Sequence, residues 1–373
     1  MTKRITVLGT RGIPDVLGGV ETHCQNLYPA IKARYQNEVD ICVIARSPYV
    51  NYQRSVYRGV KTRSIWAPKK KSLEAIIHST LAALATRFDG SDIVHVHAIG
   101  PGLVVPLLRL LGKKVVFTHH GPDYARQKWG RFARMALMLG ERWAVKYANE
   151  VIVISEVINT LVKNTYGRND AHLIPNGVNL PAPLDPAIAS QTMTQFSLQA
   201  GEYIVAVGRF VEEKGLHDLI EAWKQSGISF PLVLVGDADH PTPYSEKLKQ
   251  LARNTPGVIL TGFQRGAVLQ ALFAQARLFV MPSYHEGLPI ALLEAMSYSL
   301  PAVISDIPAN LEVGLEPDAY FPVGNVAALA EKIASRSNLP TTDYQHYLAR
   351  YNWDTIAEQT MQIYKNISNK STG

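Results

Sequence analysis

The sequence predicts an α/β protein built from two facing Rossmann-like lobes, each containing a doubly wound parallel sheet. The chain has 373 residues, more than the roughly 100–200 residues of one typical domain. Along it, short apolar runs of strand length alternate with helical patterns, and this alternation starts again after residue 200. Continuous apolar strands separated by helices are typical of a parallel sheet that helices cover on both faces.

The first lobe is expected to comprise residues 1–178. Its apolar runs predict the strands Arg4–Gly9, Val39–Ala45, Val60–Ile65, Ile93–His97, Lys114–Thr118 and Val151–Ile154. Between these runs, helix-like segments predict helices at Val20–Arg34, Ser72–Phe88 and Lys128–Ala148.

Residues 179–200 are expected to link the lobes, because they contain the proline-rich run Leu180-Pro181-Ala182-Pro183. The second lobe, residues 201–353, repeats the pattern of the first. Its expected strands are Tyr203–Val207, Leu232–Val235, Val258–Thr261, Leu278–Met281 and Ala302–Ile304. Its expected helices are Leu216–Lys224, Pro243–Arg253, Val268–Gln275 and Pro289–Met296. We expect the substrate cleft between the lobes, where the carboxyl ends of the strands meet.

Charge is distributed unevenly between the lobes. Residues 1–178 hold 25 Lys and Arg against 12 Asp and Glu, whereas residues 179–373 hold 13 against 19. The first lobe is therefore expected to face an anionic surface or ligand, with its basic bias strongest in the acid-free stretch Ile41–Leu73. The basic segments lack a groove-reading motif, so nucleic acid is not an expected partner.

Cysteine usage and hydropathy bear on localisation. Cys24 and Cys42 lie in apolar contexts and offer neither a disulfide framework nor a set of metal ligands. The best apolar stretch, Gly102–Phe117, is interrupted by charges before it reaches the roughly 18–20 residues of a spanning helix. The start, Met1–Leu8, lacks the features of a signal peptide. We expect a cytoplasmic protein that can bind peripherally to the cytoplasmic face of a membrane.

The segment Pro282–Pro301 predicts an anion site. It follows an expected strand, and Pro289 suits the first position of a helix, where its missing amide hydrogen is no loss. The expected free amides of Leu288, Ile290 and Ala291 and the positive end of the helix dipole suit a diphosphate.

Glu286 and Glu294 bracket this anion site. Because a carboxylate repels a diphosphate, we expect each to accept hydrogen bonds from hydroxyls, Glu294 from a ribose and Glu286 from a sugar ring. The alternative is an ordinary strand–turn–helix unit with one solvated and one capping carboxylate.

Two cations, Arg209 and Lys214, follow the first strand of the second lobe in the segment Val207–Gly215. We expect both to project toward the anion site, where they would stabilise a departing diphosphate without a metal ion. The alternative is a pair of solvated surface cations.

The order and spacing of these residues resemble a known family. Gly208-Arg209, Lys214-Gly215, Thr261-Gly262-Phe263 and the pair Glu286 and Glu294, with seven residues between them, resemble the donor-binding half of the family 4 retaining glycosyltransferases of GT-B fold. The resemblance implies catalytic roles for Arg209, Lys214 and Glu286. It implies donor-binding roles for Gly208, Phe263, Leu288, Pro289, Ile290 and Glu294.

The resemblance extends to the first lobe. Gly18-Gly19-Val20-Glu21 resembles the glycine-rich loop of the family, where donor phosphate and acceptor approach the backbone, and implies that Gly18 and Gly19 bind donor and Glu21 acceptor. Thr118-His119-His120-Gly121 resembles the T-x-H motif, which implies that His120 lies over the reaction centre. The resemblance also implies that Asp123 and Lys128, which come after this motif, bind the acceptor. Tyr351-Asn352-Trp353 and residues 354–373 resemble the terminal helix that crosses back onto the first lobe.

Two further signals involve metal ligands and histidines. Asp237-Ala238-Asp239 matches a D-x-D metal motif but lies where the family has a glycine-rich turn, so no metal site is expected there. His95 and His97 are expected to point to opposite faces of one strand, His95 into the core and His97 toward the acceptor at the edge of the cleft.

The segment Arg126–Asn149 predicts an amphipathic helix. At helical spacing, five cations fall within an arc of about 120°: Lys128, Arg131, Arg134, Arg142 and Lys146. The expected opposite side carries the apolar residues Trp129, Phe132, Leu139 and Trp143. Two interpretations stay open, a helix packed on the sheet with a solvated basic face, or a face that binds a membrane surface or lipid pyrophosphate.

Together these observations predict a retaining hexosyltransferase. It would move a sugar from a nucleotide diphosphate sugar, with UDP favoured as the nucleotide, to a glycan or lipid-linked acceptor, with no cofactor and no metal requirement. A sugar-nucleotide epimerase of the same fold is an alternative, which acceptor-independent interconversion of the donor would identify. A catalytically silent nucleotide-sugar-binding protein is another, which would bind donor without turnover.

Overall fold

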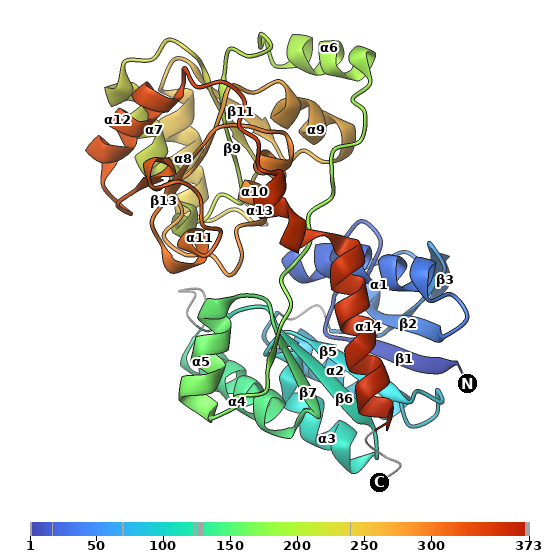
Figure 1. Ribbon diagram of the computed structural model, residues 1–373. Helices are drawn as coiled ribbons and strands as arrows, with labels where there is room; N and C mark the ends of the chain where they lie inside the picture. The colour runs from blue at the N-terminus through green and yellow to red at the C-terminus, as the bar shows by residue number, and fades with distance from the viewer. Residues whose placement is uncertain are drawn as a thin grey trace. The chain divides into compact units, whose positions relative to one another are not determined.

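The computed structural model describes residues 2–16, 18–68, 71–122, 124, 130–238 and 240–369. The chain divides into two compact units, the first formed by Met1–Gly177 with Arg350–Gly373 and the second by Val178–Ala349 (Figure 1). Each unit has a mostly parallel sheet with helices connecting its strands. The predicted α/β class with two doubly wound lobes is confirmed.

The sheet of the first unit has the strand order β3-β4-β2-β1-β5-β6-β7-β8. The six predicted strands are present, with ends within one residue of the expected ones. The strands are β1 Lys3–Leu8, β2 Val39–Arg46, β3 Arg54–Tyr57, β4 Val60–Ile65, β5 Ile93–His97, β6 Lys114–His119, β7 Glu150–Val153 and β8 His172–Leu173.

One edge of this sheet departs from the expected parallel arrangement. β3, which the sequence analysis did not predict, pairs antiparallel with β4. The two strands are joined by Arg58 and Gly59, both with positive φ, 46° and 81°. A two-residue turn of this kind matches the twist of a hairpin, whereas parallel neighbours need a long crossover.

Helices cover the sheet of the first unit, and the chain's last helix is one of them. They are α1 Gly19–Arg34, α2 Lys71–Ala85, α3 Val105–Leu110, α4 Arg131–Tyr147, α5 Glu156–Tyr166 and α14 Trp353–Asn369. Helix α14 lies beside α1 (Figure 1), and its residues Met361 and Tyr364 share a core cluster with Leu27 and Tyr28 of α1. Helix α14 is therefore part of the hydrophobic core of the first unit, although the whole second unit lies between it and α5 in the sequence.

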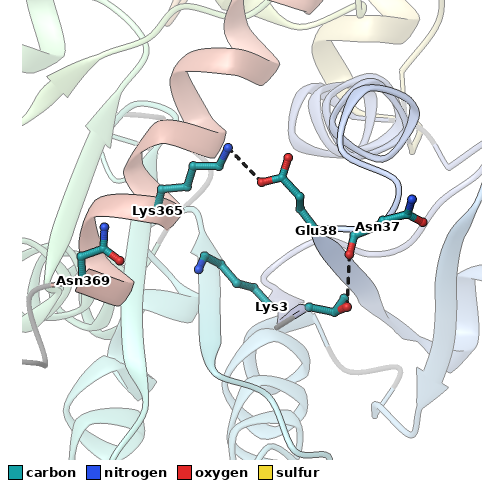
Figure 2. A pocket seen from close by; sticks show the side chains of 6 residues that line it. Lys3, Asn37, Glu38, Lys365 and Asn369 are labelled. Atoms are coloured by element: carbon teal, nitrogen blue, oxygen red, sulfur yellow. Dashed lines mark hydrogen bonds and ion pairs between the residues drawn. The ribbon is translucent and has the colours of Figure 1, made fainter.

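An open hollow of about 480 Å³ lies where α14 passes the start of β1 (Figure 2). Lys365 of α14 forms an ion pair with Glu38 across it, with Nζ and Oε2 2.9 Å apart. Lys3, at the amino end of β1, also lines the hollow. Doubly wound sheets bind ligands at the carboxyl ends of their strands, whereas this hollow lies at the amino end of β1, away from the expected site.

The sheet of the second unit is wholly parallel, in the order β11-β10-β9-β12-β13-β14. Numbered within the unit this order is 3-2-1-4-5-6, which is that of dinucleotide-binding Rossmann sheets. Its strands are β9 Ile204–Val207, β10 Leu232–Val235, β11 Val258–Gly262, β12 Leu278–Met281, β13 Ala302–Ser305 and β14 Tyr320–Phe321. All four residues of β10, β12 and β13 are buried, as expected for strands covered on both faces.

The first described helix of the second unit begins earlier in the chain than expected. They are α6 Pro186–Gln195, α7 Leu216–Ser226, α8 Pro243–Arg253, α9 Gly266–Ala274, α10 Ile290–Ser297, α11 Pro308–Leu311, α12 Val326–Arg336 and α13 Gln345–Leu348. Residues 186–195 of the segment expected as a linker instead form α6, which packs against α9. The Asp185 side chain caps α6 by accepting a hydrogen bond from the Ala187 amide, 2.8 Å away, and Pro186 begins the helix.

Candidate active site

The strand order of the second unit brings its candidate residues to one place. After β9 the chain continues to β10 on one side of the sheet, and after β12 it continues to β13 on the other side. Strands β9 and β12 are themselves paired, with Ile204 opposite Leu278. Gly208 and Arg209 follow β9, and the turn 282–289 follows β12. The point between two such strands is where doubly wound sheets bind their ligands.

Lys214 and Glu286 form an ion pair at this point. The Lys214 Nζ lies 2.5 Å from the Glu286 Oε1, and the Ser283 hydroxyl donates to the same oxygen over 2.6 Å. The side chains are only 21% and 10% exposed, which limits screening by water. The structure thus brings together the expected phosphate-binding cation and the expected sugar-binding carboxylate, and pairs them directly.

Backbone contacts join the loops that carry this pair. Lys214 ends a short 3-10 helix, Glu212–Lys214, and the Glu213 carbonyl accepts a hydrogen bond from the Tyr284 amide, 2.8 Å away. Gly215 follows with a φ of 61°, and a Cβ there would lie 2.3 Å from the Pro282 carbonyl oxygen. Only glycine therefore permits this approach of the two loops.

Gly208 and Arg209 lie in the same loop system. A Cβ at Gly208 would lie 3.6–3.7 Å from the side-chain carbons of Lys214, so the lysine stem packs over this glycine. Arg209 is partly buried, and its carbonyl accepts from the Val211 amide at 2.9 Å. The next residue, Phe210, is buried in the core and anchors the loop.

The beginning of α10 differs from the expectation. Pro289 is the N-cap rather than the first helical residue, and α10 starts at Ile290. The Ile290 amide donates to the Leu288 carbonyl over 2.9 Å, with Pro289 at φ −80° and ψ 71°. These angles are those of an inverse γ-turn. The prediction that the Ile290 amide is free for an anion is therefore wrong, because the turn at Pro289 uses it.

Two further donor candidates, Glu294 and Phe263, also belong to the second unit. Glu294 is half-buried within α10, and burial raises its pKa to about 7. Near neutral pH its carboxyl group is therefore partly protonated and can both accept from and donate to a hydroxyl. Phe263 follows β11 at the far edge and is 50% exposed.

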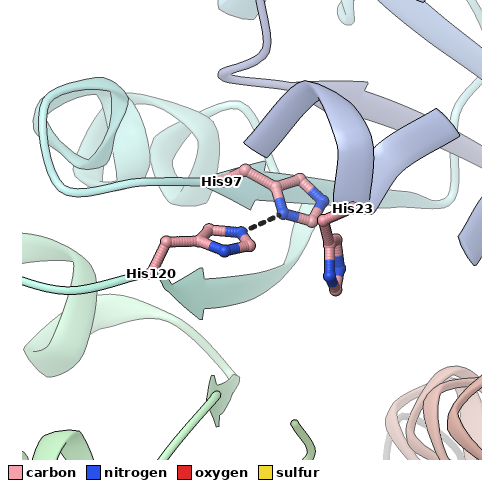
Figure 3. Close-up of side chains that lie close together, drawn as sticks. All are labelled: His23, His97 and His120. Atoms are coloured by element: carbon pink, nitrogen blue, oxygen red, sulfur yellow. Dashed lines mark hydrogen bonds between the residues drawn. The ribbon is translucent and has the colours of Figure 1, made fainter. Parts of the chain in front are cut away.

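In the first unit, the candidate histidines gather at the carboxyl ends of β5 and β6. His97 ends β5 and His120 follows β6, with His97 Nδ1 and His120 Nε2 2.9 Å apart (Figure 3). His23, from the beginning of α1, completes a cluster, with ring centroids 5.4 Å from His97 and 4.9 Å from His120. The sequence analysis did not identify His23, although it stands only two residues after Glu21 in the glycine-rich segment.

His95 and His97 lie on the same face of β5. Their rings stack with centroids 4.3 Å apart, and both contact the Tyr28 hydroxyl of α1, at 3.1 and 2.5 Å. The prediction of opposite faces is wrong, because residues two apart on a strand share a face. His95 is nevertheless buried in the core as expected, with Thr118 and Tyr364 as further hydrogen-bond partners.

Burial keeps this cluster neutral. It lowers the pKa of His23 to about 4, and with the neighbouring histidines it lowers the pKa values of His97 and His120 well below the usual range. A charged imidazole beside other imidazoles in a poorly hydrated site is unfavourable. At neutral pH the rings therefore carry lone pairs that can accept hydrogen bonds or bind a metal ion.

The glycine-rich segment holds Glu21 in place. Its carboxylate accepts from the Arg11 amide at 2.8 Å and from the Arg11 side chain at 3.3 Å. A Cβ at Gly18 would lie 2.0 Å from Glu21 Oε2, so the carboxylate lies directly over this glycine. Gly19, by contrast, begins α1 with open space around it. Glu21, a predicted acceptor ligand, is thus buried and bound to Arg11.

A second buried network fixes the backbone on both sides of His120. His119 donates from Nε2 to Glu141 over 2.7 Å and accepts from the Gly121 amide at 3.0 Å. Burial alone would raise the pKa of Glu141, but hydrogen bonds from His119 and two tyrosines outweigh this effect and lower that pKa. The predicted acceptor residues Asp123 and Lys128 lie outside the described residues.

Helix α4 exposes apolar side chains that were expected to pack inside. Phe132 is 89% and Met135 65% exposed, and Leu139 is also exposed. Of the two open interpretations, a helix whose apolar side packs on the sheet does not hold for Phe132 and Leu139, because the buried side of the helix is made by Gly140, Glu141, Ala144 and Val145. Exposed Arg131 and Arg134 lie among the apolar residues.

Comparison with known proteins places both units in one family. The model of Glycosyltransferase Family 4 matches residues 17–181, and that of Glycosyl transferases group 1 matches residues 201–337. The chain belongs to the family 4 glycosyltransferases.

Relatives of this family 4 glycosyltransferase align over almost its whole length. Alpha-maltose-1-phosphate synthase of Mycolicibacterium smegmatis is 26% identical, over 98% of this chain and 100% of the relative. The putative glycosyltransferase EpsF of Bacillus subtilis is 28% identical, over 95% of this chain and 94% of the relative.

Solved structures share the fold of this glycosyltransferase. Sucrose-phosphate synthase from Thermosynechococcus elongatus is 23% identical with a TM-score of 0.82, over 99% of this chain and 100% of the other. Anabaena HepE in complex with UDP and glucose is 16% identical with a TM-score of 0.77, over 98% of this chain and 100% of the other. The predicted GT-B fold is confirmed.

Proposed function

We propose that this glycosyltransferase moves a hexose from a UDP-sugar to a glycan or lipid-linked acceptor with retention of the anomeric configuration. The observation that carries the proposal is the Lys214–Glu286 pair, held with Ser283 where β9 and β12 diverge. UDP and glucose bound to HepE support the choice of donor. Relatives named for teichuronic acid and colanic acid biosynthesis support a glycan acceptor.

Donor binding would exchange the partners of this pair. The diphosphate would take Lys214 and Arg209, and a hydroxyl of the sugar would take the Glu286 carboxylate. Cleavage of the sugar–phosphate bond places negative charge on the diphosphate, where the two cations stabilise it. The acceptor hydroxyl would attack from the face that the phosphate leaves and give its proton to that phosphate. This course retains configuration and needs no covalent sugar–enzyme intermediate.

A panel of nucleotide sugars tests the proposal. A UDP-hexose is expected to raise the unfolding temperature and to be hydrolysed slowly or transferred to added glycans. The anomeric configuration of the product, measured by NMR, is expected to match that of the donor. An inverted product would refute retention, interconversion of the donor alone would identify an epimerase, and binding without turnover would identify a silent binding protein.

Transfer is expected to continue at full rate in excess EDTA. Two cations already oppose the diphosphate, and Asp237 of the D-x-D sequence is engaged in an ion pair, its Oδ1 2.7 Å from Lys249 Nζ. Asp239 lies outside the described residues. Assays of the wild type and Asp239→Asn, with EDTA and with added Mg²⁺ or Mn²⁺, are expected to give equal rates. The proposal would be contradicted if the wild type strictly required Mg²⁺ or Mn²⁺ and lost its response to the metal when Asp237 or Asp239 was replaced.

We also propose that α4 docks the first unit on an anionic membrane, where a lipid-linked acceptor would lie. None of the described helices combines the length and apolar composition needed to cross a bilayer. Instead, α4 exposes Phe132 and Met135 beside Arg131 and Arg134. Apolar side chains can enter the headgroup region while each nearby cation contributes on the order of 1 kcal/mol.

Vesicle co-sedimentation tests this docking. The protein is expected to sediment with anionic vesicles at low salt and to be released as salt screens the attraction over about 10 Å at 0.1 M. Arg131→Gln with Arg134→Gln, or Phe132→Ser alone, should weaken sedimentation. The control Lys247→Gln with Arg253→Gln removes the same charge from exposed positions of α8 and should sediment as the wild type does. Equal sedimentation of all variants would remove the membrane proposal only.

A further inference from the structure

Two ring nitrogens of the histidine cluster lack hydrogen-bond partners among the described residues. His23 Nε2 and His120 Nδ1 are both buried and unpaired. A buried polar atom left without a partner costs about 1–3 kcal/mol. The His23 ring is 3% exposed, so bulk water does not satisfy its free nitrogen. Of the two, His23 Nε2 is the nitrogen that can join His97 Nδ1 and His120 Nε2 around a ligand, while His120 Nδ1 is left to carry its ring proton.

The arrangement of the three rings matches that of three histidines around a tetrahedral metal ion. With metal–nitrogen distances of about 2.1 Å, ligand nitrogens lie about 3.4 Å apart and ring centroids about 5 Å apart. The His97 and His120 nitrogens are 2.9 Å apart, and the three centroid distances are 5.4, 4.9 and 5.2 Å. One nitrogen from each ring lies within 4.8 Å of the others, compared with about 3.4 Å between ligands of a bound ion.

Hydrogen bonds behind two of the rings, His23 and His97, orient them for ligation. His23 Nδ1 donates to the Asn176 amide oxygen over 2.6 Å, which turns its unprotonated Nε2 away from that amide. His97 Nε2 contacts the Tyr28 hydroxyl and can carry the ring proton there, which leaves the His97 Nδ1 lone pair facing His120. The second ring nitrogen of a metal-binding histidine characteristically donates its N–H to a carbonyl or other polar oxygen.

We propose that His23, His97 and His120 bind a transition-metal ion such as Zn²⁺, with a fourth coordination position open. Three neutral imidazoles without a carboxylate or thiolate suit Zn²⁺, Co²⁺, Ni²⁺ or Cu²⁺ and disfavour Mg²⁺ and Ca²⁺. The family resemblance implies that His120 lies over the reaction centre, so a metal ion held by His120 would block that position and act as a reversible inhibitor. This inhibitory consequence rests on the proposed function, whereas metal binding does not.

Binding is measured on the full chain without a polyhistidine tag. After treatment with EDTA and removal of the chelator, titration with CoCl₂ is expected to give one equivalent of tetrahedral Co²⁺ with visible absorption bands. ZnCl₂ is expected to displace it. His23→Gln should weaken Co²⁺ affinity at least 10-fold, as loss of one ligand does. His78→Gln, which changes another buried histidine of the first unit, outside the cluster, should leave the affinity unchanged.

Asn176→Ala provides a second, milder test, because it removes only the hydrogen bond that orients His23. Loss of such a supporting contact typically lowers metal affinity about 10–100-fold. Absence of a tetrahedral Co²⁺ spectrum in the wild type, or unchanged spectra and affinities in both His23→Gln and Asn176→Ala, would overturn the proposal.

The consequence for transfer is measured separately. Micromolar Zn²⁺ is expected to inhibit the wild type and His78→Gln, EDTA to restore their rates, and His23→Gln to resist inhibition. Unchanged transfer by a Zn²⁺-saturated wild type would refute inhibition. Lack of any transferase activity, with metal binding intact, would refute the proposed function and leave the metal site standing.

Discussion

Replacing Arg209 or Lys214 by alanine is expected to lower turnover about 10²-fold or more at saturating donor. Each cation is assigned to the departing diphosphate, and loss of one group that stabilises transition-state charge typically has an effect of this size. The structure adds a reason specific to Lys214, whose Nζ lies 2.5 Å from Glu286 Oε1. Lys214→Ala removes the phosphate partner and also leaves the largely buried Glu286 carboxylate without its counter-ion.

The control is Lys224→Ala in the same unit. Lys224 is exposed on α7 and pairs with Glu221 three residues away, 3.0 Å between Nζ and Oε2. Its removal is expected to leave kcat unchanged, since exposed pairs of this kind contribute little. Turnover is compared by initial rates at saturating donor, after thermal unfolding has shown that each variant is folded. Wild-type turnover in Arg209→Ala or Lys214→Ala would show that the assigned role of that residue is wrong.

Replacing Gly215 by alanine is expected to destabilise the second unit and to lower turnover about 10²-fold. A Cβ at this position would lie 2.3 Å from the Pro282 carbonyl oxygen, so the loops carrying Lys214 and Glu286 must separate. Displacement of catalytic groups by about 1 Å is enough for a loss of this size.

Gly227→Ala is a matched control at the other end of the same helix. Gly215 precedes and Gly227 follows α7, with similar φ values of 61° and 68°, but nothing lies within 4 Å of a Cβ at Gly227. Alanine therefore suffers the left-handed backbone strain of about 1–2 kcal/mol at both sites and the steric clash only at Gly215. Denaturant unfolding and turnover measure the difference. Equal losses in the two variants would show that the contact with Pro282 is unimportant.

The strands of both units could be predicted because they are buried on both faces. Segments such as Leu232–Val235 are apolar at every position, and this continuity marks a parallel sheet without any knowledge of neighbours. Strand β3 could not be found in this way. It lies at an exposed edge with a polar sequence, and its pairing depends on the turn at Arg58 and Gly59.

The candidate site was predicted in its residue types and only partly in its contacts. The sequence pointed to Lys214 and Glu286, which are 72 residues apart in the chain. Their direct pairing depends on the close approach of the two loops that carry them. The sequence also pointed to the start of α10, where the Ile290 amide was expected to be free. In the structure that amide donates to the Leu288 carbonyl in the inverse γ-turn at Pro289.

The histidine cluster shows what sequence spacing could and could not reveal. A shared face for His95 and His97 follows from strand geometry alone, and the sequence analysis missed it. The approach of His23, His97 and His120 does not follow from spacing, because these residues come from three different elements of the first unit.

The sequence by itself determined the alternation of buried strands and helices, the two-lobe α/β fold and the family, because hydrophobic periodicity and short motifs are local properties of the chain. Tertiary structure alone decided that Lys214 meets Glu286, that Asn176 orients His23 and that α4 turns Phe132 outward. These contacts join residues brought together by strand order and loop packing. Side-chain burial and pairing arise from those long-range neighbours, which no local stretch of sequence specifies.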